Sequence, residues 1–177
     1  RIIAGTSAGA INAAVMASHA DDFAFGAERL GQFWGNFRCH HIYRTGWLHN
    51  MGTGLHWLAS MTLGGLGIAN PKSLLDNRPL GRLLERELDT AGIRRAIDNG
   101  HLDALLVTAS GYATSRAVTF FQGRDEFTEW RRYKRAGVRS AIDARHLLAS
   151  AALPLLFPAQ PIGNEYFGDG GMRHTTP

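Results

Sequence analysis

Two short glycine-rich segments near opposite ends of the chain carry side chains suited to acyl-transfer chemistry. Ser7 lies at the centre of Gly5-Thr6-Ser7-Ala8-Gly9, which follows an apolar pair and precedes an alanine-rich stretch. This layout is typical of a nucleophile elbow, where a strained strand-to-helix turn needs small neighbours such as Gly5 and Gly9. The first amides of the following helix also favour negative charge near the serine. Because the motif is common by chance, the rest of the chain must decide its meaning.

Asp169 is the candidate base for such a serine. A serine hydroxyl is a poor nucleophile at neutral pH and needs a base within about 2.6–3.2 Å. Asp169 follows a short strand-like segment, and its neighbours are Gly168, Gly170 and Gly171. These glycines permit left-handed backbone angles and a close approach of main chain to another group. The same letters also fit a tight Asp-Gly hairpin turn, so this segment alone leaves both readings open.

The elements that must position the two groups follow an α/β pattern. We expect residues 2–4 to form the end of a strand, with further strands over 102–109, 117–121 and 165–167. Helices are expected over 8–19, from Asp21 or Asp22 to about Phe37, and over 79–90, 93–99 and 144–152. Strands that alternate with helices predict a three-layer α/β/α fold with a mostly parallel central sheet. Residues 40–70 lack a sustained period, and we expect either an apolar lid over a lipid site or a helical hairpin packed on the core.

Length and composition indicate a single domain over residues 1–177. Cys39 is the only cysteine, which excludes a disulfide within the chain, and no apolar run is long enough to span a bilayer. A soluble chain is therefore expected, cytoplasmic or peripheral to a membrane. Adjacent Cys39, His40 and His41 do not show metal-ligand spacing, so neither a metal nor another cofactor is predicted.

Positive charge gathers in one segment. The net charge is +4, and the densest cluster of cations is interleaved with Trp130 and Tyr133. Its members are Arg131, Arg132, Lys134, Arg135 and Arg139. Either an ordinary solvated face or a peripheral contact with an anionic membrane surface fits this cluster, whereas no nucleic-acid motif accompanies it. The sequence sets no oligomeric state.

Four ordered segments resemble the patatin-like phospholipases over nearly the whole chain. These are Gly5-Thr6-Ser7-Ala8-Gly9-Ala10 with Ile11-Asn12, Leu75-Asp76-Asn77-Arg78-Pro79-Leu80, Ala149-Ser150-Ala151-Ala152-Leu153-Pro154 with Phe157-Pro158, and Asp169-Gly170-Gly171 with Pro177. The resemblance implies that Ser7 is the nucleophile and Asp169 the base of a Ser-Asp dyad. It also implies a lipid ester substrate, hydrolysed through an acyl-enzyme intermediate without a cofactor.

One part of the family pattern is missing from the sequence. The family's oxyanion hole resembles a glycine-rich loop that precedes the nucleophile after the first strand, whereas Ser7 is only the seventh residue here. We therefore expect a fragment truncated at the N-terminus, and also at the C-terminus. Since one lost oxyanion donor costs about 100- to 1,000-fold in turnover, this chain alone is expected to have little activity. Thr175 also departs from the asparagine that the family often carries.

Two other functions are compatible with the residues. A Ser-His-Asp esterase would need His146 or His174 as its base, although His174 lies only five residues after Asp169. The other is a lipid- or protein-binding module of the same fold that does not catalyse a reaction. Substitution of each histidine and covalent labelling of Ser7 would discriminate among the three.

Overall fold

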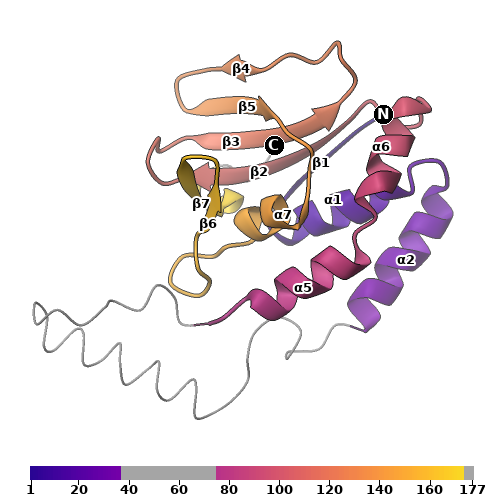
Figure 1. The fold of residues 1–177 in the computed structure, drawn as a ribbon, viewed down its shortest axis with the longest axis horizontal. Coiled ribbons are helices and arrows are strands. Elements are labelled where there is room, and N and C mark those ends of the chain that lie inside the picture. Colours follow the sequence, from indigo (N-terminus) through magenta and orange to yellow (C-terminus); the bar gives the residue numbers. More distant parts are fainter. Residues whose placement is uncertain (37–74, 174–177) are drawn as a thin grey trace, which may run out of the picture.

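The computed structural model of the chain describes residues 1–36 and 75–173 (Figure 1). Its helices are α1 (Ala8–Ser18), α2 (Phe23–Gly35), α5 (Arg78–Glu87), α6 (Thr90–Asp98) and α7 (Ala144–Ser150), followed by a 3-10 turn, η1 (Gly170–Met172). Its strands are β1 (Ile2–Thr6), β2 (Ala104–Gly111), β3 (Ala117–Gly123), β4 (Trp130–Arg131), β5 (Arg135–Arg139), β6 (Gln160–Ile162) and β7 (Glu165–Asp169). The expected irregular stretch at 40–70 and His174 lie outside the described residues.

The strands form one sheet in the order β4-β5-β3-β2-β7-β6, with β1 also beside β2. The α/β class is as predicted, but the sheet among the described residues is mixed rather than mostly parallel. Only β1–β2 and β3–β5 pair in parallel, while β2–β3, β2–β7, β4–β5 and β6–β7 are antiparallel. The reason is chain length: residues 112–116 alone join β2 to β3, whereas a parallel crossover needs about a dozen residues.

The helices among the described residues pack on one face of this sheet (Figure 1). Leu105, Val107 and Ala109 of β2 point into a single hydrophobic core shared with α1, α5, α6 and α7. Helix α2 adds partly buried aromatic side chains to the same core. Within the described residues, the sheet thus has a helical layer on one face, and the second helical layer of the expected three-layer arrangement is not among them.

Strands β1 and β7 share one edge of β2, and this arrangement positions the site. Strand β3 occupies the other edge of β2 from Ala104 to Ser110. On the shared edge, β1 runs parallel to β2 and ends with Thr6 opposite Thr108. Strand β7 runs antiparallel and ends with Asp169 opposite Ala109. The carboxyl ends of β1 and β7 therefore meet head-on at adjacent positions of β2.

Helix α1 lies close to the sheet because its inward side chains are small. Ala10, Ala13, Ala14 and Ala17 are all buried in the core. Short side chains leave little distance between the helix backbone and the strand that precedes it. The close approach brings the start of α1 directly against the end of β1.

Helix α7 begins with a reciprocal cap. The Asp143 carboxylate accepts hydrogen bonds from the amides of Arg145 and His146, and the His146 side chain reaches back to the Asp143 backbone. His146 is 4% exposed, and its ring meets Phe120 edge-on at 4.9 Å between centroids. Burial lowers the pKa of His146, although its contact with Asp143 opposes that effect. For Asp143, burial acts to raise the pKa, but hydrogen bonds from Arg145 and His146 outweigh it and lower the pKa.

This cap makes stability depend on pH. Because the pKa of His146 is lower in the folded than in the unfolded chain, acidification below about pH 6.5 protonates the unfolded state preferentially. Stability should therefore fall between pH 7.5 and 5.5, by at most about 1.4 kcal/mol per pH unit from this one group. Urea unfolding at both pH values should show a smaller loss for His146→Gln than for the unaltered chain. An equal loss in both proteins would contradict this assignment.

Candidate active site

Ser7 occupies a strained turn between β1 and α1. Its backbone has φ 56° and ψ −130°, a region that residues other than glycine rarely adopt. A Cβ at Gly5 would overlap the carbonyl oxygen of Gly9, so the turn requires glycine at position 5. A Cβ at Gly9, by contrast, would have no described atom within 4 Å. The two motif glycines thus differ: Gly5 permits the turn, and Gly9 leaves free space beside it.

The hydroxyl of Ser7 is hydrogen-bonded to Asp169 across 162 residues of sequence. Ser7 Oγ donates to Asp169 Oδ2 at 2.6 Å. The other carboxylate oxygen, Oδ1, accepts from the Gly171 amide at 2.7 Å, and the Asp169 amide donates to the Ala152 carbonyl at 2.8 Å. Asp169 is 3% exposed. The carboxylate is therefore held in one orientation, with Oδ2 directed at the serine.

Glycines beside Asp169 let β7 end against β1. A Cβ at Gly170 would overlap the Thr108 carbonyl oxygen and lie 2.7 Å from the Thr6 methyl. A Cβ at Gly171 would lie 3.0 Å from Asp169 Oδ1, tighter than ordinary van der Waals contact. Gly170 therefore allows the head-on meeting of the two strands. Gly171 leaves room for the carboxylate to accept its amide.

The carboxyl end of α7 contacts both halves of the site. The Ser7 amide donates to Ser150 Oγ at 2.9 Å, and the Ser150 hydroxyl donates to the Thr108 carbonyl at 2.6 Å. Ser150 is 0% exposed. Two residues further on, the Ala152 carbonyl accepts the Asp169 amide. Sequence reasoning placed Ser150 only within a family-like segment, because a serine at a helix end carries no signal of which distant amide it will bind.

The histidines considered as alternative bases do not contact Ser7 among the described residues. His146 has its Nδ1 2.8 Å from Asp143 Oδ1, within the cap of α7. His174 lies outside the described range. The hydrogen-bonding partner of the Ser7 hydroxyl is the carboxylate of Asp169.

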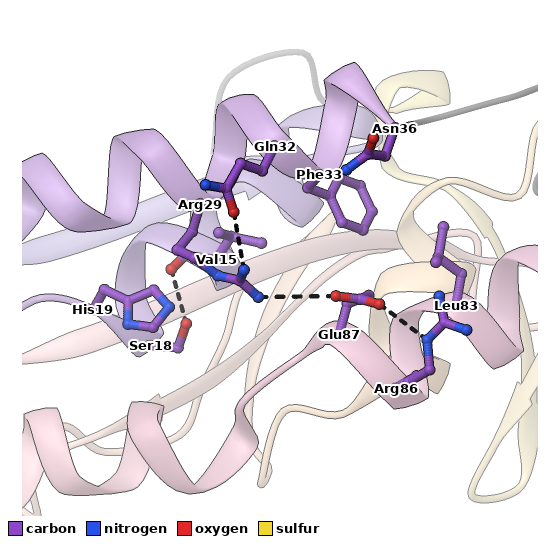
Figure 2. Close-up of a pocket in the computed structure, with 10 residues that line it drawn as sticks. All are labelled: Val15, Ser18, His19, Arg29, Gln32, Phe33, Asn36, Leu83, Arg86 and Glu87. Carbon is purple, nitrogen blue, oxygen red and sulfur yellow. Dashed lines mark hydrogen bonds and ion pairs between the residues drawn. The ribbon is translucent and has the colours of Figure 1, made fainter.

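A well-formed pocket lies elsewhere, between α1, α2 and α5 (Figure 2). It has a volume of about 300 Å³, and neither Ser7 nor Asp169 lines it. In Figure 2, Arg29 and Arg86 both point at Glu87, with closest N···O distances of 3.9 and 2.9 Å. The Glu87 carboxylate thus contacts both cations. The pocket is separate from the Ser7–Asp169 site.

Two searches of the described residues bear on cofactors and membranes. Within residues 1–36 and 75–173, histidine, cysteine, aspartate and glutamate side chains nowhere gather in threes to hold a metal ion. Over the same ranges, no helix combines the length and the apolar character needed to cross a bilayer.

Comparison with models of protein families identifies the family to which the chain belongs. The model described as Patatin-like phospholipase matches residues 1–177. The chain belongs to the patatin-like phospholipase family. A search of the curated proteins returns no match to it. Membership in the patatin-like family indicates a hydrolase that acts on lipid esters.

The two elbow glycines of this patatin-like protein should respond differently to a methyl group. Gly5→Ala should lower the free energy of unfolding by about 1–3 kcal/mol or more, because its Cβ overlaps the Gly9 carbonyl. Gly9→Ala is the matched control and should change stability little, since its Cβ enters free space. Urea unfolding of both variants checks the difference, and equal losses would refute the proposed packing of the elbow.

Ser150 should stabilise the elbow of the patatin-like site through the Ser7 amide. Ser150→Ala leaves that amide without its acceptor, which should cost about 1–3 kcal/mol and slow covalent labelling of Ser7. The control is Ser18→Ala, which removes a buried hydroxyl bonded only to Val15 of its own helix. Unfolding and labelling rates test both variants. If the probe labels Ser7 as fast in the Ser150→Ala variant as in the Ser18→Ala variant, Ser150 does not position the elbow.

Proposed function

We propose that this chain hydrolyses lipid acyl esters with Ser7 as nucleophile and Asp169 as general base. The 2.6 Å hydrogen bond from Ser7 Oγ to Asp169 Oδ2 is the observation that carries the proposal. This bond supports the proposal, because a hydroxyl within hydrogen-bond reach of a carboxylate, on a strained elbow at the start of a helix, is the arrangement that serine acyl transfer needs.

The proposed reaction has two halves. In the first, Asp169 takes the proton of the Ser7 hydroxyl while Ser7 Oγ bonds to the ester carbonyl carbon, forming a tetrahedral intermediate. Its collapse breaks the ester bond, and the leaving alcohol receives the proton from Asp169. In the second half, Asp169 deprotonates a water molecule that attacks the acyl-enzyme. The fatty acid leaves as Ser7 regains its proton.

Charge on the carbonyl oxygen must be stabilised during both halves. The Ala8 amide opens α1 and has no acceptor within that helix, so it is available as one oxyanion donor. The positive end of the helix acts in the same direction. The Ser7 amide, by contrast, is already donated to Ser150. The family resemblance implies that a glycine-rich loop supplies the remaining donors.

Covalent labelling tests the nucleophile and the base together. A fluorophosphonate probe should label Ser7, and Ser7→Ala should abolish the labelling. Asp169→Asn should slow labelling and hydrolysis of a short p-nitrophenyl ester by about 100- to 10,000-fold, the range that a general base contributes. Mass spectrometry of the labelled peptide identifies the site.

Two controls separate this proposal from the alternatives. Asp98→Asn removes an exposed carboxylate that pairs only with Arg94, and it should leave the labelling rate unchanged. His146→Gln should still label; loss of labelling in that variant with the fold intact would favour a Ser-His-Asp esterase. If the probe does not label Ser7, a binding module without turnover would be supported instead.

A further inference from the structure

The hairpin formed by β4 and β5 carries an exposed aromatic side chain at its tip among several cations. The chain turns between Arg132, whose amide donates to the Arg135 carbonyl at 2.8 Å, and Arg135 itself. Tyr133 is 88% exposed in that turn, and Lys134 lies over its ring at 5.6 Å from the centroid. Arg131, Arg132, Lys134 and Arg135 are exposed as well.

These four cations differ from Arg139, the fifth cation of the cluster identified in the sequence. Arg139 donates to the backbone carbonyls of Gly123, Arg124 and Phe127, and its guanidinium lies over Phe121. It therefore fixes the connection between β3 and β4. Across the part of the chain that the structure describes, no carboxylate is within ion-pair distance of the other four. Their charge faces outward without compensation.

Two of these cations line a hollow with an indole. Trp130, Arg132 and Arg135 enclose a volume of about 260 Å³ on one face of the hairpin. The indole lies against Gly137, where an added Cβ would overlap the indole Nε1. Arg132 and Arg135 are opposite each other in the turn, and like charges in that position destabilise a strand pair. An anion in the hollow would relieve the repulsion.

The tip lies at the same end of the sheet as Ser7. Strand β1 ends at Thr6, which is in register with Thr108, Thr119, Gly137 and Trp130 across the sheet. Beyond that row, toward the carboxyl end of β1, the β4–β5 turn follows. Figure 1 shows the β2–β3 and β4–β5 connections together at this end. A surface that contacts the tip would therefore also approach the end of the sheet at which Ser7 lies.

From these observations we infer that the tip of the β4–β5 hairpin, residues 130–135, docks on an anionic phospholipid surface, with the phosphate of a headgroup in the hollow. Uncompensated arginine and lysine side chains supply the attraction, and each basic residue near such a surface contributes about a fivefold gain in partitioning. Tyr133 and Trp130 suit the headgroup layer, because aromatic rings with a polar edge favour the membrane interface. Docking itself does not require hydrolysis; only its benefit to catalysis rests on the proposed function.

A membrane fits the hairpin better than a nucleic acid does. The cations cover only a turn of a few residues, whereas proteins that track a nucleic-acid strand line a long groove with them. A single projecting aromatic at the tip is suited to insertion among headgroups, and Ser7 lies at the same end of the sheet.

Vesicle binding tests the inference on the Ser7→Ala chain, in which the proposed nucleophile is absent and lipid is not consumed. This protein should co-sediment with vesicles of phosphatidylglycerol and phosphatidylcholine but not with pure phosphatidylcholine, and high salt should release it. Arg132→Gln with Arg135→Gln should weaken partitioning by about 30-fold. Tyr133→Ser should weaken it without changing its salt dependence. The matched control, Arg94→Gln with Arg95→Gln on α6, removes equal charge and should change little.

Several results would overturn the inference. Equal losses in the two double variants would show that net charge alone drives binding. Equal binding to neutral and anionic vesicles would exclude the headgroup contact. Release by millimolar inorganic phosphate at constant ionic strength would indicate a site for free phosphate, and binding to a single-stranded oligonucleotide without vesicle binding would indicate a nucleic-acid surface. Because alanine replaces Ser7 in the protein used for this test, none of these outcomes depends on whether the unaltered chain is a hydrolase.

Discussion

The hydrogen bond between Ser7 and Asp169 exists because one edge of β2 accepts two strands that approach from opposite directions. Strand β1 ends opposite Thr108 and β7 ends opposite Ala109, so the residues that follow or close these strands must meet. Gly170 can lie against the Thr108 carbonyl only because it has no Cβ. The chemistry thus depends on backbone packing before it depends on any reactive group.

Helix α7 reinforces that junction from the side. It is short, with only seven residues, and each end makes specific contacts. Its first turn is held by the reciprocal cap of Asp143 and His146. At its carboxyl end, Ser150 and then Ala152 just after the helix bind the amides of Ser7 and Asp169. A helix this short has little stability of its own, so tertiary contacts must hold it. One small element thus contacts the backbone of both Ser7 and Asp169.

Sequence reasoning found the helices and the buried central strands because their signals are local. Asp22, one of the two cap candidates, does cap α2, and the apolar run at Leu105–Val107 does lie in a largely buried strand. Sequence reasoning did not find β4, because Trp130 and Arg131 are exposed and resemble part of a solvated charged segment. Strand β6 is three residues long and contains Pro161, which suits an edge strand but resembles a loop. The expectation of a mostly parallel sheet was wrong for these residues because burial on both faces does not specify strand direction.

The site itself was predictable in part. Glycines around Ser7 and Asp169 mark turns where the backbone must be unusual, and the structure brings these two residues together. The support from Ser150 was not predictable, because the amide that it binds is 143 residues away in sequence. Periodicity and caps report on neighbours along the chain, whereas this contact depends on how α7 is laid against β2.

The long separation between the two halves of the site has a consequence for how the protein is made. Contacts between residues 162 positions apart carry a large loop-closure cost and tend to form late in folding. The ribosome adds Ser7 162 residues before Asp169. A nascent or partly unfolded molecule therefore carries Ser7 without its carboxylate partner. The hydrogen bond between the two can form only after β1 and β7 have both docked on β2.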